Sequence, residues 1–213
     1  MTKTADFIRA NTVLIEHRMV PEIRLWLATE ITPIWQATED WMCVNGTAPP
    51  FWAFAWPGSV AMARHILDNP EVATGRRVLD FAAGCGLAGI ACAKVKAASV
   101  EAAEIDPVAI AAAELNAAAN QTTIRTASGD IVGSTCQWDL ILCGDVCYEA
   151  PMTGHIMPWL KRMAATAEVW IADPGRTYLP SAGLQAFARY VVPTSMELED
   201  REERAVVLYR VEP

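Results

Sequence analysis

The chain has 213 residues, of which 53% are hydrophobic and 20% are charged, and its formal net charge is −8. This length and composition fit one globular domain with a full core and exclude a disordered chain. The acidic balance argues against a nucleic-acid partner, because phosphate binding needs a basic face. No apolar run reaches the roughly 18–20 residues that cross a bilayer, and the first residues lack an apolar signal core. We therefore expect a cytoplasmic protein with no membrane partner.

Six cysteines are spread along the chain without a Cys-x-x-Cys pair, and no histidine lies at metal-ligand spacing from them. We expect reduced, mostly buried thiols and no metal site. The histidines and serines also lack the sequence surroundings of a catalytic base or an activated nucleophile.

The first third of the chain predicts short, mixed elements. Apolar positions between Thr4 and Met19 favour a helix. Alternating apolar residues predict an extended segment over 23–28, and PIWQA, residues 33–37, predicts a second one paired with it. The prolines of PPFWAFAWPG, residues 49–58, exclude a regular helix there, and a helix is predicted directly afterwards over 58–68.

From Arg77 onward, predicted strands and helices alternate. Strands are predicted over 77–82, 99–105, 123–130, 138–145 and 168–174. Helices are predicted after the first strand to about residue 96, over 107–120 with Asp106 as cap, over 151–165 and over 184–191. Residues 195–200 and 204–211 are expected to close the fold as an antiparallel strand pair. Such alternation implies a parallel sheet whose ligands lie at the carboxyl ends of the strands.

A glycine-rich turn follows the first of these strands, in VLDFAAGCGLAGI, residues 78–90. Gly84 and Gly86 allow positive φ angles and a close approach of backbone to ligand, and the following helix offers free N–H groups. The spacing to Gly89, with Glu104 about twenty residues after the first glycine, also matches the dinucleotide fingerprint. A nicotinamide-dependent oxidoreductase is therefore an alternative.

Four acidic residues, Asp80, Glu104, Asp130 and Asp145, stand at the ends of successive strands, as a cofactor lying across these ends requires. Asp80 suits a cofactor with an ammonium group, whereas beside a pyrophosphate it would add unwanted negative charge. Glu104 is placed to accept hydrogen bonds from ribose hydroxyls. Asp130 is placed to accept one from an adenine amino group, and a solvated loop aspartate is an equal interpretation. The series favours S-adenosylmethionine over a dinucleotide.

VLDFAAGCGLAGI, AAEIDPVAI, SGDI and LILCGDVCYE together resemble the class I methyltransferases, which use S-adenosylmethionine. Asp145-Val146-Cys147-Tyr148 resembles the D-x-x-Y motif of a subgroup that methylates protein lysines. PPFWAFAWPG, ARHILDNP, ADPGRTYLP and ELEDRE are similar to segments of the electron transfer flavoprotein beta-subunit lysine methyltransferases. The resemblance extends from about Pro21 to the end. It implies an α/β fold, a Rossmann-like seven-stranded, mostly parallel sheet with helices on both faces, after an N-terminal helix and a short strand pair.

The resemblance also implies a site with two sides. Asp145 and Tyr148 would line the acceptor channel as catalytic residues, with Asp145 orienting the lysine. The residues that would bind the cofactor are Trp56, Asp80, Ala83, Gly84, Gly86, Glu104, Ile105, Asp130, Ile131 and Gly144. Without the resemblance, Trp56 is better interpreted as a core residue.

The function implied is methylation of a protein lysine, with S-adenosylmethionine as donor, S-adenosylhomocysteine as product and the electron transfer flavoprotein beta subunit as protein partner. Methylation of a small molecule or a ribosomal protein is an alternative, and so is a binding module without catalysis. Residues 1–57 are expected to form an N-terminal segment that covers part of the acceptor site. Residues 58–213 are expected to form the cofactor-binding domain.

Overall fold

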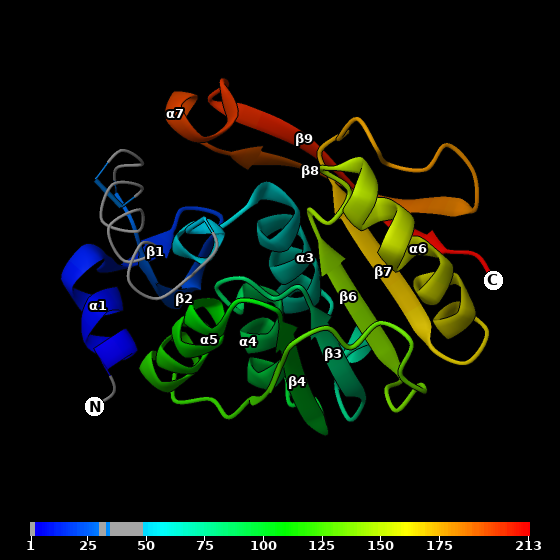
Figure 1. Cartoon of the computed structure of the whole chain (residues 1–213), viewed down its shortest axis with the longest axis horizontal. Coiled ribbons are helices and arrows are strands. Elements are labelled where there is room, and N and C mark those ends of the chain that lie inside the picture. The colour runs from blue at the N-terminus through cyan, green and yellow to red at the C-terminus, as the bar shows by residue number, and fades with distance from the viewer. Residues whose placement is uncertain (1–2, 30–32, 35–48) are drawn as a thin grey trace.

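The computed structural model describes residues 3–29, 33–34 and 49–213 (Figure 1). Seven strands form one sheet in the order β5-β4-β3-β6-β7-β9-β8. Neighbours from β5 to β7 are parallel, and β9 runs antiparallel to both β7 and β8. The predicted seven-stranded, mostly parallel sheet is therefore confirmed. Its strands are β3 (Arg77–Phe81), β4 (Ser99–Glu104), β5 (Arg125–Ser128), β6 (Leu140–Gly144), β7 (Glu168–Asp173), β8 (Leu184–Pro193) and β9 (Glu203–Val211).

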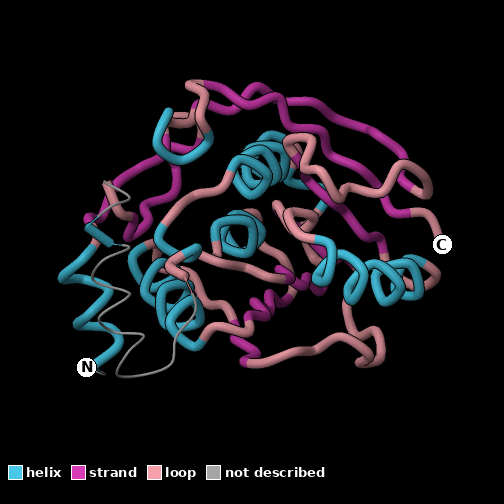
Figure 2. The backbone as a smooth tube through the Cα atoms, turned by 45° about the horizontal axis from the view of Figure 1, so that its top comes forward, coloured by secondary structure: helices cyan, strands magenta, loops and turns pink. Residues whose placement is uncertain are grey.

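Helices cover both faces of this sheet, as the alternation of strands and helices predicts. On one face lie α3 (Pro57–Asp68), α4 (Leu87–Lys94) and α5 (Pro107–Ala119), and on the other lies α6 (Ala150–Ala164) (Figure 2). Neighbouring residues of one strand point to opposite faces, so Leu140 packs in the core under α3 and α4 while Ile141 packs in the core under α6. The strand order reverses between β3 and β6, which is where a ligand crevice is expected.

The N-terminal region forms a helix and a separate hairpin beside α5. It consists of α1 (Lys3–Asn11) and the antiparallel strands β1 (Val13–His17) and β2 (Val20–Leu27). Ile8 of α1 and Trp52 of the short helix η1 (Phe51–Ala53) are buried against α5 residues such as Ala112. A second short helix, η2 (Pro70–Val72), leads into β3. The division of the chain at residue 57 stays a prediction.

Two predictions for the N-terminal region are corrected. The helix predicted over 4–19 ends at Asn11, because the side chains of Asn11 and Thr12 donate hydrogen bonds to the carbonyl groups of Phe7 and Ile8, at 2.8 and 2.6 Å. The following residues form β1, which takes the place predicted for 33–37 as the partner of β2. Residues 33 and 34 are helical, and 35–37 lie outside the described residues.

Two predictions near the C-terminus are also corrected. The helix predicted over 184–191 is wrong: these residues belong to strand β8, because Tyr190, Val191 and other residues pair along β9. Residues 195–200 were predicted as a strand, and they contain the helical turn α7 (Met196–Glu199) with Ser195 as its cap. The predicted strand over 204–211 is confirmed as β9.

Among the described helices, none combines the length and the apolar character that a membrane span requires.

Asn116 ties the N-terminal hairpin to the glycine turn. Its side chain is fully buried, accepts a hydrogen bond from the Trp26 N–H at 2.6 Å and donates one to the Cys85 carbonyl at 2.9 Å. We expect Asn116→Ala to lower the free energy of unfolding by about 1–3 kcal/mol, because it leaves a buried donor and acceptor unpaired. Urea denaturation measures this loss.

Glu114→Ala, at an exposed position of the same helix, is the matched control, with an expected change within about 0.5 kcal/mol. Equal losses in the two variants would contradict a linking role for Asn116.

Candidate active site

The turn between β3 and α4 is built from left-handed backbone. Ala82, Gly84 and Gly86 have φ angles of 53°, 53° and 76°. A Cβ atom on Gly86 would lie 3.0 Å from the Cβ of Ala113 on α5, whereas one on Gly84 would meet nothing within 4 Å. Gly86 therefore packs the turn against α5, and Gly84 leaves open space at the surface of the turn.

Asp80 lies beneath this turn. It is buried, and its Oδ2 accepts a hydrogen bond of 2.7 Å from the Gly89 N–H in the first turn of α4. Burial raises the pKa of Asp80 to about 7, against the effect of this hydrogen bond. The carboxylate thus fixes the start of α4, and it does not line the cavity described below.

Glu104 is the acid at the end of β4, and its position is fixed by backbone groups. The carboxylate accepts hydrogen bonds from the N–H groups of Gly84, Ile105 and Asp106, at 3.0, 2.8 and 3.4 Å. Burial raises the pKa of Glu104, and these hydrogen bonds partly offset that rise. Asp106 accepts from the Val108 N–H at 2.8 Å and caps α5, as predicted.

A cavity of about 550 Å³ opens at the carboxyl ends of the strands. It brings together most of the predicted site residues: Trp56, Gly84, Glu104, Ile105, Asp130, Ile131, Gly144, Asp145 and Tyr148. Three others, Asp80, Ala83 and Gly86, support the glycine turn without lining the cavity. The predicted residues therefore converge on one place, although they come from five separate segments of the chain.

Asp130 stands at the exposed edge of this cavity. Its Oδ1 accepts a hydrogen bond of 2.9 Å from the Val132 N–H, and its Oδ2 lies 2.7 Å from His155 Nε2 on α6. These partners lower the pKa of Asp130, with the backbone hydrogen bond as the larger cause. Within the described residues, no group of three or more histidine, cysteine or acidic side chains is arranged to hold a metal ion.

Asp145 lies where the end of β6 meets the start of α3. It has a φ of 55°, is 7% exposed, and its Oδ2 accepts a hydrogen bond from the Gly58 N–H. A Cβ on Gly58 would lie 2.4 Å from the Ala172 carbonyl oxygen, and one on Gly144 would lie 2.4 Å from Ser59 Oγ. The two glycines are therefore required for α3 to reach the carboxylate.

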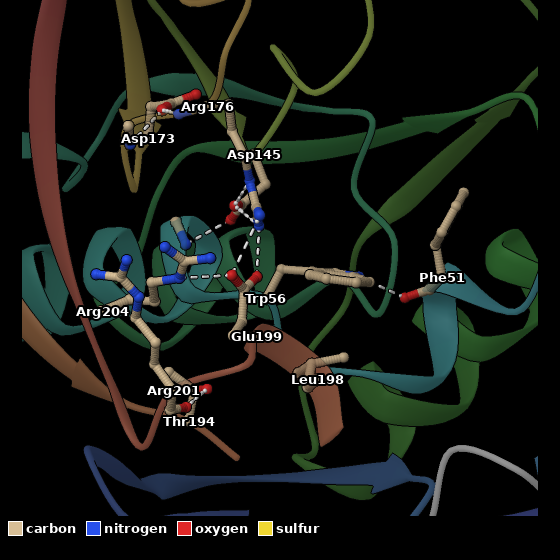
Figure 3. A network of polar contacts seen from close by, with 12 residues as sticks. Phe51, Trp56, Asp145, Asp173, Arg176, Thr194, Leu198, Glu199, Arg201 and Arg204 are labelled. Carbon is tan, nitrogen blue, oxygen red and sulfur yellow. Dashed lines mark hydrogen bonds and ion pairs between the residues drawn. The ribbon is translucent and has the colours of Figure 1, made fainter. Parts of the chain in front are cut away.

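Arg176 is the main residue of the site that the sequence analysis missed. It follows β7, and its Nη2 lies 2.8 Å from Asp145 Oδ1 while the same guanidinium contacts Glu199 of α7 (Figure 3). Asp173, at the end of β7, shapes this turn by accepting from the N–H groups of Gly175 and Arg176. A charged residue soon after a strand end was the available signal, in the segment ADPGRTYLP.

Burial raises the pKa of Asp145 to about 6, although the charge of Arg176 and the hydrogen bonds from Arg176 and Gly58 act in the opposite direction. Aromatic side chains line the same cavity as this carboxylate. The Trp56 indole donates to the Phe51 carbonyl at 2.8 Å, and its ring lies 5.8 Å from the Arg176 guanidinium carbon. Tyr148 is 44% exposed, with its ring 5.8 Å from that of Phe51. Asp145 and Arg176 thus share one side of the cavity with an aromatic rim formed by Phe51, Trp56 and Tyr148.

Comparisons with known proteins agree with this geometry. The chain is 35% identical to the electron transfer flavoprotein beta subunit lysine methyltransferase of Danio rerio, over 92% of this chain and 78% of the relative. It is also 35% identical to the Xenopus laevis protein of that name, over 92% and 81%. A family model described as ribosomal protein L11 methyltransferase (PrmA) matches residues 60–146. A magnesium protoporphyrin IX methyltransferase from Synechocystis PCC 6803, solved with bound SAM, shares the fold, with a TM-score of 0.54 and 13% identity over 84% of this chain and 93% of that chain.

The strand order, the reversed β9 and the glycine turn beside Glu104 define a class I methyltransferase that uses S-adenosylmethionine. More narrowly, the chain belongs to the electron transfer flavoprotein beta subunit lysine methyltransferase family, since relatives at 35% identity cover more than two thirds of both chains. The resemblance inferred from the motifs is confirmed. Methyl transfer to protein lysine is favoured over the ribosomal-protein and nicotinamide-dependent alternatives.

The contact of β6 with α3 gives a direct test of the site. We expect Gly144→Ala to lower the free energy of unfolding by about 1–3 kcal/mol, because the new methyl group overlaps Ser59 and must push α3 away from the strand. Thermal denaturation measures the loss, and isothermal calorimetry with S-adenosylhomocysteine measures the accompanying loss of binding.

Gly154→Ala is the matched control, because Gly154 lies inside α6 and a Cβ there meets nothing within 4 Å. It is expected to stabilise the protein by about 0.5–1 kcal/mol through a higher helix propensity. A Gly144→Ala protein as stable as the wild type would show that the close approach is not required.

Proposed function

We propose that this protein transfers a methyl group from S-adenosylmethionine to a lysine of the electron transfer flavoprotein beta subunit. The observation that supports this most is the cavity itself, because one side has the fixed acid Glu104 and the other has Asp145 within an aromatic rim. The first side suits a nucleoside, and the second suits the amine of a lysine side chain. The named substrate of the relatives is a protein that this second side could accept.

The residues around Glu104 fit the proposed cofactor. The carboxylate is held by three backbone N–H groups and keeps lone pairs for ribose hydroxyls. Ile105, which is 67% exposed, and Ile131 offer apolar surface to an adenine ring, and Asp130 can accept from its amino group. Gly84 leaves room for the donor at the glycine turn. When bound, the cofactor supplies an activated methyl group on a sulfonium centre.

The residues around Asp145 would prepare the acceptor. A lysine side chain has a pKa near ~10.4, so its ammonium must lose a proton before the nitrogen can attack a methyl group. Asp145 would orient the nitrogen by accepting a hydrogen bond, and the buried surroundings favour the neutral amine. Tyr148 would pack against the aliphatic stem of the lysine and keep water away from the nitrogen, while Trp56 would pack on the cofactor.

Asp145→Asn tests the acceptor side. We expect kcat to fall by roughly a hundredfold or more, because the amide keeps the size of the side chain but removes the anion that orients the amine. Incorporation of tritium from labelled S-adenosylmethionine measures kcat. Calorimetry with S-adenosylhomocysteine should show an affinity within a few-fold of the wild type.

Asp68→Asn is the control, since Asp68 is an exposed ion-pair partner on the surface of α3 and its change removes the same charge. Wild-type turnover in Asp145→Asn would remove Asp145 from the proposed mechanism.

The proposed substrate is tested with purified electron transfer flavoprotein and tritiated S-adenosylmethionine. We expect the label in the beta subunit, on lysine residues that mass spectrometry can locate. The same assay with a whole-cell lysate, separated on a gel, compares all other acceptors. Label in other proteins with none in the beta subunit would contradict the proposed substrate while leaving the methyl-transfer chemistry intact.

We further propose that the protein works in the cytoplasm. The support is chemical: the described cysteines are free, and Cys85, Cys92, Cys143 and Cys147 are buried. Burial raises the pKa of these thiols well above its usual value, so they stay protonated and unreactive, as expected of core residues in a reducing compartment.

A further inference from the structure

Arg176 and Glu199 lie outside the predicted site. Arg176, anchored by Glu199, holds the carboxylate oxygen of Asp145 that the Gly58 N–H of α3 does not contact. Arg176 lies between two carboxylates: its Nη2 is 2.8 Å from Asp145 Oδ1, and the guanidinium makes two contacts with Glu199, of 2.5 and 3.1 Å (Figure 3). The Glu199 side chain is 1% exposed and has a second cation, Arg204, at 2.7 Å. A buried carboxylate with two arginine partners gives Arg176 a fixed anchor.

We propose that Arg176 is a positioning residue for methyl transfer: anchored by Glu199, it fixes Asp145 and balances its charge, so that the acceptor lysine is held as the neutral amine. This inference rests on the proposed role of Asp145 at the acceptor side. It adds Arg176, Glu199 and Arg204 to the residues on which the reaction depends, and none of the three belongs to the D-x-x-Y segment.

The contacts of Asp145 determine what the acceptor meets. One carboxylate oxygen accepts from the Gly58 N–H, and the other accepts from Nε and Nη2 of Arg176, so both are engaged before a substrate arrives. A lone pair can still accept one N–H from an amine. An ammonium group would instead bring a net positive charge into a site whose anion is already paired, which is costly in a buried environment. The neutral amine, whose lone pair must attack, is therefore the favoured form.

Arg176 is the group that offsets the negative charge of Asp145, and the other described groups that face this carboxylate do not. Asp173, at the end of β7, raises the pKa of Asp145. Cys147 lies on the same loop as Asp145, and burial raises the pKa of its thiol to about 12, so the thiol is neutral. The start of α3 contributes the Gly58 N–H, which lowers this pKa of Asp145. Within the described part of the chain, Arg176 is the cation that lowers the pKa of Asp145, which burial raises to about 6. Loss of the guanidinium would therefore raise the pKa of Asp145 further.

The anchor also explains why Arg176 stays in place when a lysine enters. Its side chain is 19% exposed, and it lies between Glu199 and the Trp56 ring, 5.8 Å from the ring centre. A lysine that displaced it would have to break two contacts with Glu199 as well as those with Asp145. The incoming nitrogen is accordingly expected to approach Asp145 beside Arg176, from the side of the aromatic rim.

The test is the pH dependence of kcat for Arg176→Gln, with purified electron transfer flavoprotein and S-adenosylmethionine as substrates. We expect the rising limb of the profile to move to higher pH by about one to three units. Without the guanidinium, the carboxylate of Asp145 binds a proton or a lysine ammonium more tightly, so the neutral amine forms only at higher pH. Alkaline pH should restore part of the activity. Arg176→Lys, which keeps the charge, should keep the wild-type limb with a lower kcat.

Arg125→Gln is the matched control, because this arginine is 68% exposed on the edge strand β5 and its change removes the same charge. Its profile should overlay that of the wild type. If Arg176→Gln does not fold, Arg204→Gln takes its place. This change leaves Glu199 with Arg176 as its remaining cation and draws the guanidinium from Asp145, so a smaller upward shift is expected.

A second measurement does not depend on the acceptor. Carbon-13 NMR of protein labelled at aspartate, with the Asp145 signal identified by Asp145→Asn, should show titration near pH 6 in the wild type and at higher pH in Arg176→Gln. If the midpoint moves but the wild type methylates no flavoprotein, the proposed substrate is wrong and the role of Arg176 stands. Unchanged midpoints, with kcat lowered equally at every pH, would overturn the inference.

Discussion

The site depends above all on the close approach of α3 to the end of β6. At that point a glycine on each side, Gly58 and Gly144, leaves no space for a Cβ atom, so backbone meets backbone. The Gly58 N–H can then reach the carboxylate of Asp145. The residues that precede α3, including Trp56, are carried to the cavity by the same contact. A small increase in this separation would therefore move the acid and the aromatic rim together.

A second regularity is that six acids at the carboxyl edge of the sheet accept hydrogen bonds from nearby backbone N–H groups. Parallel strands end in turns whose N–H groups point toward the same edge, so carboxylates placed there are held without long side-chain partners. Those that line the cavity have positions that are set before a ligand binds, which reduces the cost of ordering them on binding; they are Glu104, Asp106, Asp130 and Asp145. The acids held in this way are Asp80, Glu104, Asp106, Asp130, Asp145 and Asp173.

Sequence patterns predicted the parts of the site that arise locally. Glu104 and Asp145 could be recognised because each follows a buried strand, and the strand decides where its last residue lies. The contact of Arg176 with Glu199 could not, because these residues are 23 positions apart and meet only when β8 and β9 fold back. The same hairpin explains the wrong helix over 184–191. Its alanine, arginine and glutamine residues favour a helix, and pairing with β9 overrides that preference.

The position of β9 between β7 and β8 has a consequence for biosynthesis. The glycine turn and Glu104 belong to one short stretch of chain and can take shape soon after the ribosome releases it. Arg176 and its anchor Glu199 emerge later, and β8 has no place in the sheet until β9 inserts beside β7. Competence for transfer would appear only when the last strand has docked, so enzyme activity would report on completion of the fold.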